Sequence, residues 1–236
     1  MKYVKKLRGA RVYLSPMCAQ DAQQYYEWLN DPAVTDGVGT TANVMSLEGE
    51  QRWLAENAGD YQFAIVLEEG DRLIGNCGIK EIDWKRRCGE VGLFLGNEAD
   101  RGKGYGKEVL RLLLGYCFET LNLHNVQLHV FSFNVRAIAA YKSAGFREAG
   151  RRREAYFLHG EWHDELAMDI LQQEWLAQML ILELLADGKR MPSAELEKAV
   201  NERGISSRTM RTAKSRIGDR LVTEKDGTAW VCYLRN

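Results

Sequence analysis

The stretch at residues 90–115, EVGLFLGNEADRGKGYGKEVLRLLLG, constrains the fold of this chain more than any other segment. Residues 91–95 form a short apolar run, which is typical of a buried strand. After a loop, the segment RGKGYG at 101–106 leads directly into apolar residues at helical spacing, from Val109 to Leu114. This order of strand, glycine loop and helix suits phosphate binding. Glycines let the backbone approach closely, and the free N–H groups of the first helical turn point at the anion.

The glycine loop fits neither of two common phosphate-binding loops. A Walker loop requires Lys and then Ser or Thr after its last glycine, whereas Gly106 is followed by Lys107 and Glu108. A dinucleotide fingerprint requires G-x-G-x-x-G, whereas these glycines lie at 102, 104 and 106. The pattern Arg-x-x-Gly-x-Gly instead resembles the pyrophosphate loop of the GNAT N-acetyltransferase superfamily, which holds acetyl-CoA. The alternative is a glycine-rich turn that merely precedes a helix.

A second segment strengthens this resemblance. Residues 134–146 read NVRAIAAYKSAGF, in which Asn134 ends an apolar run, Tyr141 lies seven residues on, and Gly145-Phe146 closes a short helix. The GNAT superfamily has a strand that ends in Asn, a short helix with Tyr at this spacing, and a closing Gly-Phe. With segments 112–124 and 154–171, the chain looks most like the branch of spermidine, ribosomal-protein N-terminal and amino-sugar acetyltransferases. The resemblance covers about residues 8–171.

The resemblance and the order of the expected elements predict an α+β fold with a mixed sheet, the acyl-CoA N-acyltransferase fold. We assign residues 1–171 to this domain. Helices are expected at 21–29, 46–55, after the glycine loop and at 137–144, while residues 35–45 read as a loop. Strands are expected at 11–14, 62–67, 73–79, 91–95, 124–133, 146–158 and 162–170.

The reaction that the resemblance implies is acetyl transfer from the CoA thioester to an amine. A free alkylamine has a pKa near ~10.4, so a base must remove its proton, and the thiolate and oxyanion need donors. The family pattern makes Tyr141 the general acid, in contact with the cosubstrate, and gives Asn134 a hydrogen bond to the pantetheine arm. A packing aromatic and a helix-capping Asn are the alternatives. Phe94 or Leu95 would offer an N–H to the thioester oxygen.

The pyrophosphate is expected over the glycine loop. The two lysines there either add charge or are only solvated. The residues implied are Arg101, Gly102, Lys103, Gly104, Tyr105, Gly106 and Lys107.

Two residues compete for the role of general base. His129 lies five residues before Asn134, where the ribosomal-protein branch has a glutamate, and an unperturbed histidine titrates near neutral pH. Glu90, at the start of the opposing strand, is the second candidate. The sequence does not identify the acceptor amine. The acidic residues in and near the first helices are spread among aromatic residues and do not single out polyamines. They are Asp21, Glu27, Asp31 and Asp36.

Composition narrows the class of protein. The chain has 236 residues, which suits one large domain or one domain with a small one, and a formal net charge of −1 implies no global attraction to nucleic acid or acidic lipid. The five cysteines stand far apart, so neither a metal site nor a disulfide framework is expected. The charged N-terminus and the lack of a membrane-length apolar run favour a cytoplasmic protein without a membrane partner.

About 65 residues follow the resembling region. Helices are expected at 173–185, 193–202 and 207–217, followed by a hairpin about Asp226-Gly227. This order is that of a winged helix-turn-helix, and residues 172–236 look like winged-helix modules at the ends of some phage and plasmid replication proteins. In the third helix, Met210, Ala213 and Ile217 should face the core. The opposite face would meet DNA, and it carries Arg208, Arg211, Thr212 and Ser215. The alternative is that the module serves packing or homo-oligomer assembly.

The sequence therefore predicts an acetyl-CoA-dependent N-acetyltransferase. It would act by direct attack on a primary amine of a small molecule or a protein N-terminus. The alternative is a DNA-binding regulator whose acetyltransferase-like domain senses CoA without turnover. An intact Tyr141 and a complete glycine loop favour the enzyme.

Overall fold

The computed structural model describes residues 2–57, 59 and 61–235. The chain forms two compact units. The first is Met1–Ala144 with Glu148–Asp169, and the second is Gly145–Arg147 with Ile170–Asn236. The domain assignments of residues 1–171 and 172–236 stay predictions.

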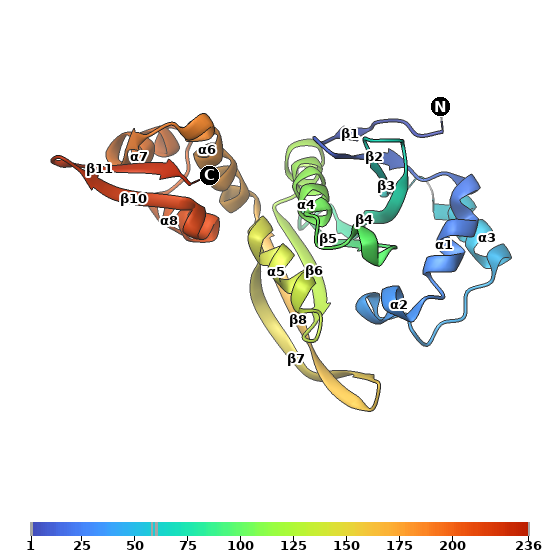
Figure 1. The fold of residues 1–236 in the computed structure, drawn as a ribbon. Coiled ribbons are helices and arrows are strands. Elements are labelled where there is room, and N and C mark those ends of the chain that lie inside the picture. The colour runs from blue at the N-terminus through green and yellow to red at the C-terminus, as the bar shows by residue number, and fades with distance from the viewer. Residues whose placement is uncertain (1, 58, 60, 236) are drawn as a thin grey trace. The chain divides into compact units, whose positions relative to one another are not determined.

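A mixed sheet forms the frame of the first unit (Figure 1). Its strands lie in the order β1-β2-β3-β4-β5-β6-β8-β7, with antiparallel pairs from β1 to β5 and a parallel pair between β5 and β6. The predicted mixed sheet is confirmed. The strands are β1 Leu7–Arg8, β2 Val12–Pro16, β3 Gln62–Leu67, β4 Leu73–Asp83, β5 Cys88–Leu95, β6 Asn125–Phe131, β7 Arg147–Leu158 and β8 Glu161–Leu171.

Five α-helices are interleaved with the strands in the described part of this unit. They are α1 Ala22–Trp28, α2 Pro32–Val38, α3 Leu47–Asn57, α4 Tyr105–Gly115 and α5 Val135–Ala144. Helix α2 lies where the sequence was read as a helix end and a loop, so that part of the prediction is wrong. The Asp31 side chain accepts a hydrogen bond from Ala33 N, and Pro32 occupies the first turn, so these residues start a helix.

The two faces of the sheet bury different helices. Val66 of β3 belongs to a buried cluster with Tyr25 and Trp28 of α1. Phe63 points to the other face and packs against Tyr116 of the π-helical turn after α4, with ring centroids 5.7 Å apart. Each fully buried leucine stabilises such a layer by roughly 1.5–3 kcal/mol. The predicted apolar face of α4 is buried: Val109, Leu110, Leu113 and Leu114.

The second unit has its own core. Its elements are α6 Gln172–Leu184, β9 Met191–Pro192, α7 Ser193–Glu202, α8 Ser207–Ile217, β10 Leu221–Asp226 and β11 Ala229–Leu234. The three strands pair in the order β10-β11-β9, and β9 was not predicted. Ser206 caps α8 by accepting from Thr209 N. The predicted inward residues of α8, Met210, Ala213 and Ile217, are buried.

Among the described residues, none of the helices has the length and apolar character that a membrane crossing needs. The cytoplasmic location stays a prediction.

Candidate active site

The glycine loop lies between β5 and α4. Gly102 and Gly104 have φ of +75° and +83°, in the left-handed region that a side chain disfavours. Gly104 is the residue before α4, which begins at Tyr105, so the first-turn N–H groups of the helix face the loop. Lys103 and Lys107 are both exposed at this end of the helix. The local geometry therefore suits an anion.

Arg101 ties the loop to the rest of the unit. Its guanidinium donates to the Leu95 carbonyl at 3.0 Å and 3.1 Å and to the Ala33 carbonyl at 2.9 Å. It also forms an ion pair with Glu98 at 2.7 Å. Because the Arg101 guanidinium already donates to these oxygen atoms, it holds the loop in shape. Its contact with a pyrophosphate stays a prediction.

Arg11 of the β1–β2 turn braces the same loop, and sequence reasoning missed it. Its Nη1 donates to the Lys103 carbonyl at 2.9 Å, and the guanidinium lies over the Tyr105 ring, 5.1 Å from the centroid. Glu108 of α4 holds Arg11 by accepting from its backbone N–H at 2.7 Å and from its Nε at 3.1 Å. Burial acts to raise the pKa of Glu108, but hydrogen bonds from Arg11 and Val12 outweigh it and lower the pKa.

We expect the Arg11→Ala variant to bind CoA about three- to tenfold more weakly, since the Lys103 carbonyl loses its partner and the loop its lateral support. Titration calorimetry with CoA measures the change. Arg8→Ala removes an exposed arginine from β1 and is the matched control for lost charge. An Arg11→Ala affinity equal to that of the control would contradict the bracing role.

The pairing between the parallel strands β5 and β6 ends early, beside this loop. Pairing of β5 with β6 runs through Cys88↔Asn125, Gly89↔Val126 and Glu90↔Gln127, although β5 continues to Leu95 and β6 to Phe131. Residues 91–95 pair with β4 along one edge. The backbone groups of an inner strand alternate between its two edges, so those of 91–95 that face β6 lie beyond the last pair. The resemblance assigns groups of this edge to pantetheine. Gly96 N donates to Ile74 O, so Phe94 N–H faces β4 and Leu95 N–H faces the open edge. Of the two candidates for the thioester oxygen, Leu95 is therefore the better placed.

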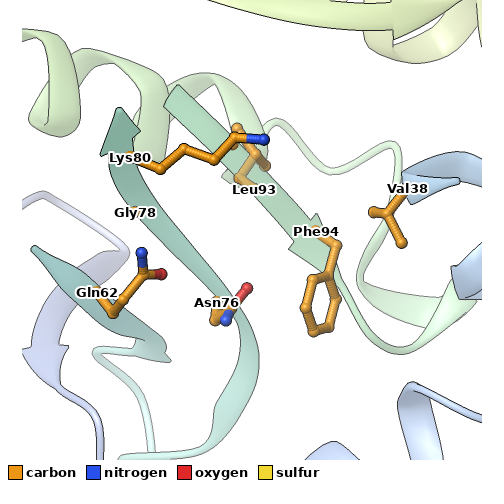
Figure 2. A pocket seen from close by; sticks show the side chains of 8 residues that line it. Val38, Gln62, Asn76, Gly78, Lys80, Leu93 and Phe94 are labelled. Atoms are coloured by element: carbon orange, nitrogen blue, oxygen red, sulfur yellow. The ribbon is translucent and has the colours of Figure 1, made fainter. Parts of the chain in front are cut away.

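A pocket of about 190 Å³ lies on the same part of the sheet (Figure 2). Gly78 of β4 pairs with Gly92 of β5, and a Cβ at Gly92 would meet only open space. Lys80 is the charged residue among those that line it. The lining consists of Val38, Gln62, Asn76, Gly78, Lys80, Gly92, Leu93 and Phe94.

Asn134 and Tyr141 belong to α5 and its start. Asn134 Oδ1 accepts from Ala137 N at 3.1 Å, so the helix-capping role is confirmed, while its contact with pantetheine stays a prediction. Tyr141 is buried, and this burial raises its pKa to about 12, so the phenol stays protonated at neutral pH. Neither residue is among those that line the pocket.

The two candidates for the general base are neighbours. His129 Nδ1 lies 3.1 Å from Glu90 Oε2, and Lys80 Nζ lies 2.8 Å from Glu90 Oε1. The parallel pairing of β5 with β6 places them together, although 39 positions separate them in the sequence.

Comparisons with known proteins agree with this geometry. A family model described as "Acetyltransferase (GNAT) domain" matches residues 11–147. The chain is 35% identical over 112 residues to a spermidine N(1)-acetyltransferase of Vibrio cholerae, covering 47% of this chain and 64% of that protein. It is 28% identical over 186 residues to the uncharacterized N-acetyltransferase p20 of Bacillus licheniformis, covering 73% and 99%.

A solved structure shares the fold. It is the crystal structure of spermidine N-acetyltransferase from Vibrio cholerae in complex with CoA and spermine, with a TM-score of 0.65 and 25% identity over 71% of this chain and 99% of that one. The sheet, the glycine loop and these matches define an acetyl-CoA-dependent N-acetyltransferase. The chain belongs to the GNAT acetyltransferase family, as its sequence predicted, and the family model spans more than half of it.

Proposed function

We propose that this enzyme transfers acetyl from acetyl-CoA to a primary amine of a small molecule or a protein N-terminus by direct attack. The observation that carries the proposal is the pocket at Gly92. Gly92 lies on β5, and beyond Glu90 the edge of β5 that faces β6 is unpaired beside the glycine loop. A cosubstrate arm along residues 91–95 would bring its thioester to this pocket.

The proposed roles follow the order of the reaction. The loop at 101–107 holds the pyrophosphate, and an N–H of Phe94 or Leu95 stabilises the oxyanion. A base among Glu90 and His129 removes the ammonium proton, and the amine attacks the thioester carbon. Tyr141 then protonates the departing thiolate, since its raised pKa keeps the phenol protonated.

Spermidine is the first acceptor to test, because it is the substrate in the name of the Vibrio cholerae relative. The eight pocket-lining residues include Lys80 and no carboxylate, so this lining alone does not select a polycation. A turnover screen with acetyl-CoA should compare spermidine, amino sugars, aminoglycosides and N-terminal peptides. CoA binding without turnover of any acceptor would favour a CoA sensor over an enzyme.

A second activity is favoured by the exposed face of α8, and we propose that the second unit is a winged helix that binds duplex DNA. The three helices, with a hairpin of β10 and β11 after α8 that pairs with β9, suit this fold. Arg208, Arg211 and Ser215 are exposed, and Thr212 is half-buried. Arg216 of α8 does not add to this basic surface, because its side chain is only 10% exposed and pairs with Glu174 at 2.9 Å.

We expect the full-length Arg208→Ala/Arg211→Ala variant to lose DNA binding while acetylation of any accepted amine is unchanged. Each phosphate contact should contribute about −0.9 to the slope of log affinity against log salt. Gel shifts across salt concentrations measure both. Lys189→Ala/Lys198→Ala, which removes two exposed lysines outside α8, is the control. Absence of a salt-sensitive shift in the wild type at low ionic strength would instead indicate a packing or assembly module.

A further inference from the structure

Three charged or titratable side chains form a continuous row of contacts across the neighbouring strands β4, β5 and β6. Lys80 of β4 contacts one oxygen of Glu90 of β5 at 2.8 Å, and the other oxygen contacts Nδ1 of His129 of β6 at 3.1 Å. Lys80 and Glu90 are also direct cross-strand partners. Both Glu90 oxygens are thus held by neighbours, and its side chain is only 15% exposed.

This row of side chains begins at the pocket. Lys80 lines it, as does Gly92, which lies two residues after Glu90 on the same face of β5. Figure 2 shows the Lys80 side chain lying across β4 toward β5 at the pocket. The His129 side chain is 39% exposed and can receive a proton from solvent or from a bound amine.

The contact with Glu90 fixes which histidine nitrogen is basic. A carboxylate accepts hydrogen bonds, so Nδ1 must carry the hydrogen that it donates to Glu90. The neutral imidazole then has its lone pair on Nε2. Glu90 already accepts from both neighbours, so it is less suited than Nε2 to take the ammonium proton.

We propose that Lys80, Glu90 and His129 act as one proton-accepting unit, with His129 Nε2 as the base and Glu90 and Lys80 as positioning residues. This inference rests on the proposed function. The N–H bond of the acceptor ammonium breaks, its proton moves to Nε2, and the freed lone pair forms the C–N bond at the thioester carbon. When the tetrahedral intermediate collapses, the C–S bond breaks and Tyr141 gives its proton to the leaving thiolate. The second proton lost by the nitrogen restores the phenol. The imidazolium later returns the proton to solvent.

Other charged groups near β6 are held by partners of their own. On β8, Glu165 binds Arg152 at 2.7 Å and Asp169 binds Asn125 at 3.2 Å. Asp164 pairs with Arg151 at 3.3 Å. On α2, Asp36 binds Thr41 and His159.

Two substitutions should affect the hydrogen bonding of His129 differently. Glu90→Gln replaces a carboxylate, which only accepts, by an amide that can also donate, so Nδ1–H loses the partner that fixes it. Lys80→Met frees one Glu90 oxygen and leaves the other in contact with Nδ1, so the tautomer should be kept. A merely structural role would not separate the two variants in this way.

Nuclear magnetic resonance of ¹⁵N-histidine protein measures the His129 tautomer without any acceptor. The chain has four histidines, and His129→Gln identifies the signal. The wild type should show Nδ1–H, and Glu90→Gln should lose that preference. Lys85→Met removes an exposed lysine and should shift nothing. A wild type with Nε2–H, or a Glu90→Gln variant that keeps the Nδ1–H preference, would overturn the unit.

The pH profile of kcat/KM tests the catalytic part. His129→Ala should remove the acid-side limb, whereas Glu90→Gln should lower kcat/KM and keep the limb, because Nε2 is still present. Loss of the limb in Glu90→Gln but not in His129→Ala would make Glu90 the base and overturn the proposal. A wild type without turnover would refute the proposed function and the catalytic role together, whereas the tautomer would still decide whether Glu90 orients His129.

Discussion

The Tyr141→Phe variant should lose about 10²–10⁴-fold in kcat and keep the wild-type affinity for CoA. The substitution removes the phenolic proton and leaves the ring, so the packing of α5 is retained. The pKa of about 12 adds a condition on pH. A general acid works while it is protonated, and Tyr141 stays protonated as pH rises until about 12. The wild-type profile should therefore show no loss of this acid below pH ~10.

Steady-state kinetics at saturating acetyl-CoA, with calorimetry for CoA, separate the two effects. Tyr25→Phe is the matched control, because Tyr25 is a buried tyrosine whose hydroxyl has no hydrogen-bond partner among the described residues. Its kcat should stay near that of the wild type. A Tyr141→Phe enzyme with nearly normal kcat would remove Tyr141 from the role of general acid.

The second large effect is expected at Gly104, where valine should reduce CoA affinity by more than tenfold. The φ of +83° is strained for any residue with a side chain, and more so for a β-branched one. A Cβ there would also lie 3.3 Å from Arg11 Nη2. The loop must therefore change shape at the point where α4 begins, and the N–H groups that face the anion move with it.

Gly70→Val is the control for backbone strain. Gly70 has a φ of +74° in the β3–β4 turn, and a Cβ there meets no atom within 4 Å. Thermal unfolding should show similar destabilisation of both variants by roughly 1–2 kcal/mol, whereas calorimetry should show a CoA defect only in Gly104→Val. Equal CoA affinities in the two variants would place the pyrophosphate elsewhere.

The segments that the sequence predicted well are those with local signals. The apolar spacing of α4, the Ser206 cap and the glycines before Tyr105 each depend on residues a few positions apart. Helix α2 was missed because Asp-Pro both ends one helix and starts another, and the choice depends on the Asp31 side chain. Strand β9 has two residues, and its pairing with β11 leaves no mark in a local pattern.

The candidate site shows the same limit. Glu90 and His129 were treated as rivals because each strand was considered alone, and parallel pairing makes them partners. The Arg11 contact to Glu108 spans 97 positions. Arg216 is a basic residue of α8, yet its side chain pairs with Glu174 of α6, a contact that the sequence of α8 alone does not show. Contacts between distant segments decide such cases.

Because the pairing between β5 and β6 ends early, we expect the stability of the fold to depend on the supply of acetyl-CoA. An inner strand with unpaired backbone groups leaves the sheet short of hydrogen bonds that a neighbouring chain would supply. A pantetheine arm carries amide groups, and in the proposed placement it takes the position of a missing strand. A ligand at 100 times its Kd raises the free energy of unfolding by about 2.7 kcal/mol. The enzyme should therefore resist unfolding and proteolysis best in cells that are rich in acetyl-CoA, and a fall in that supply would shorten its lifetime.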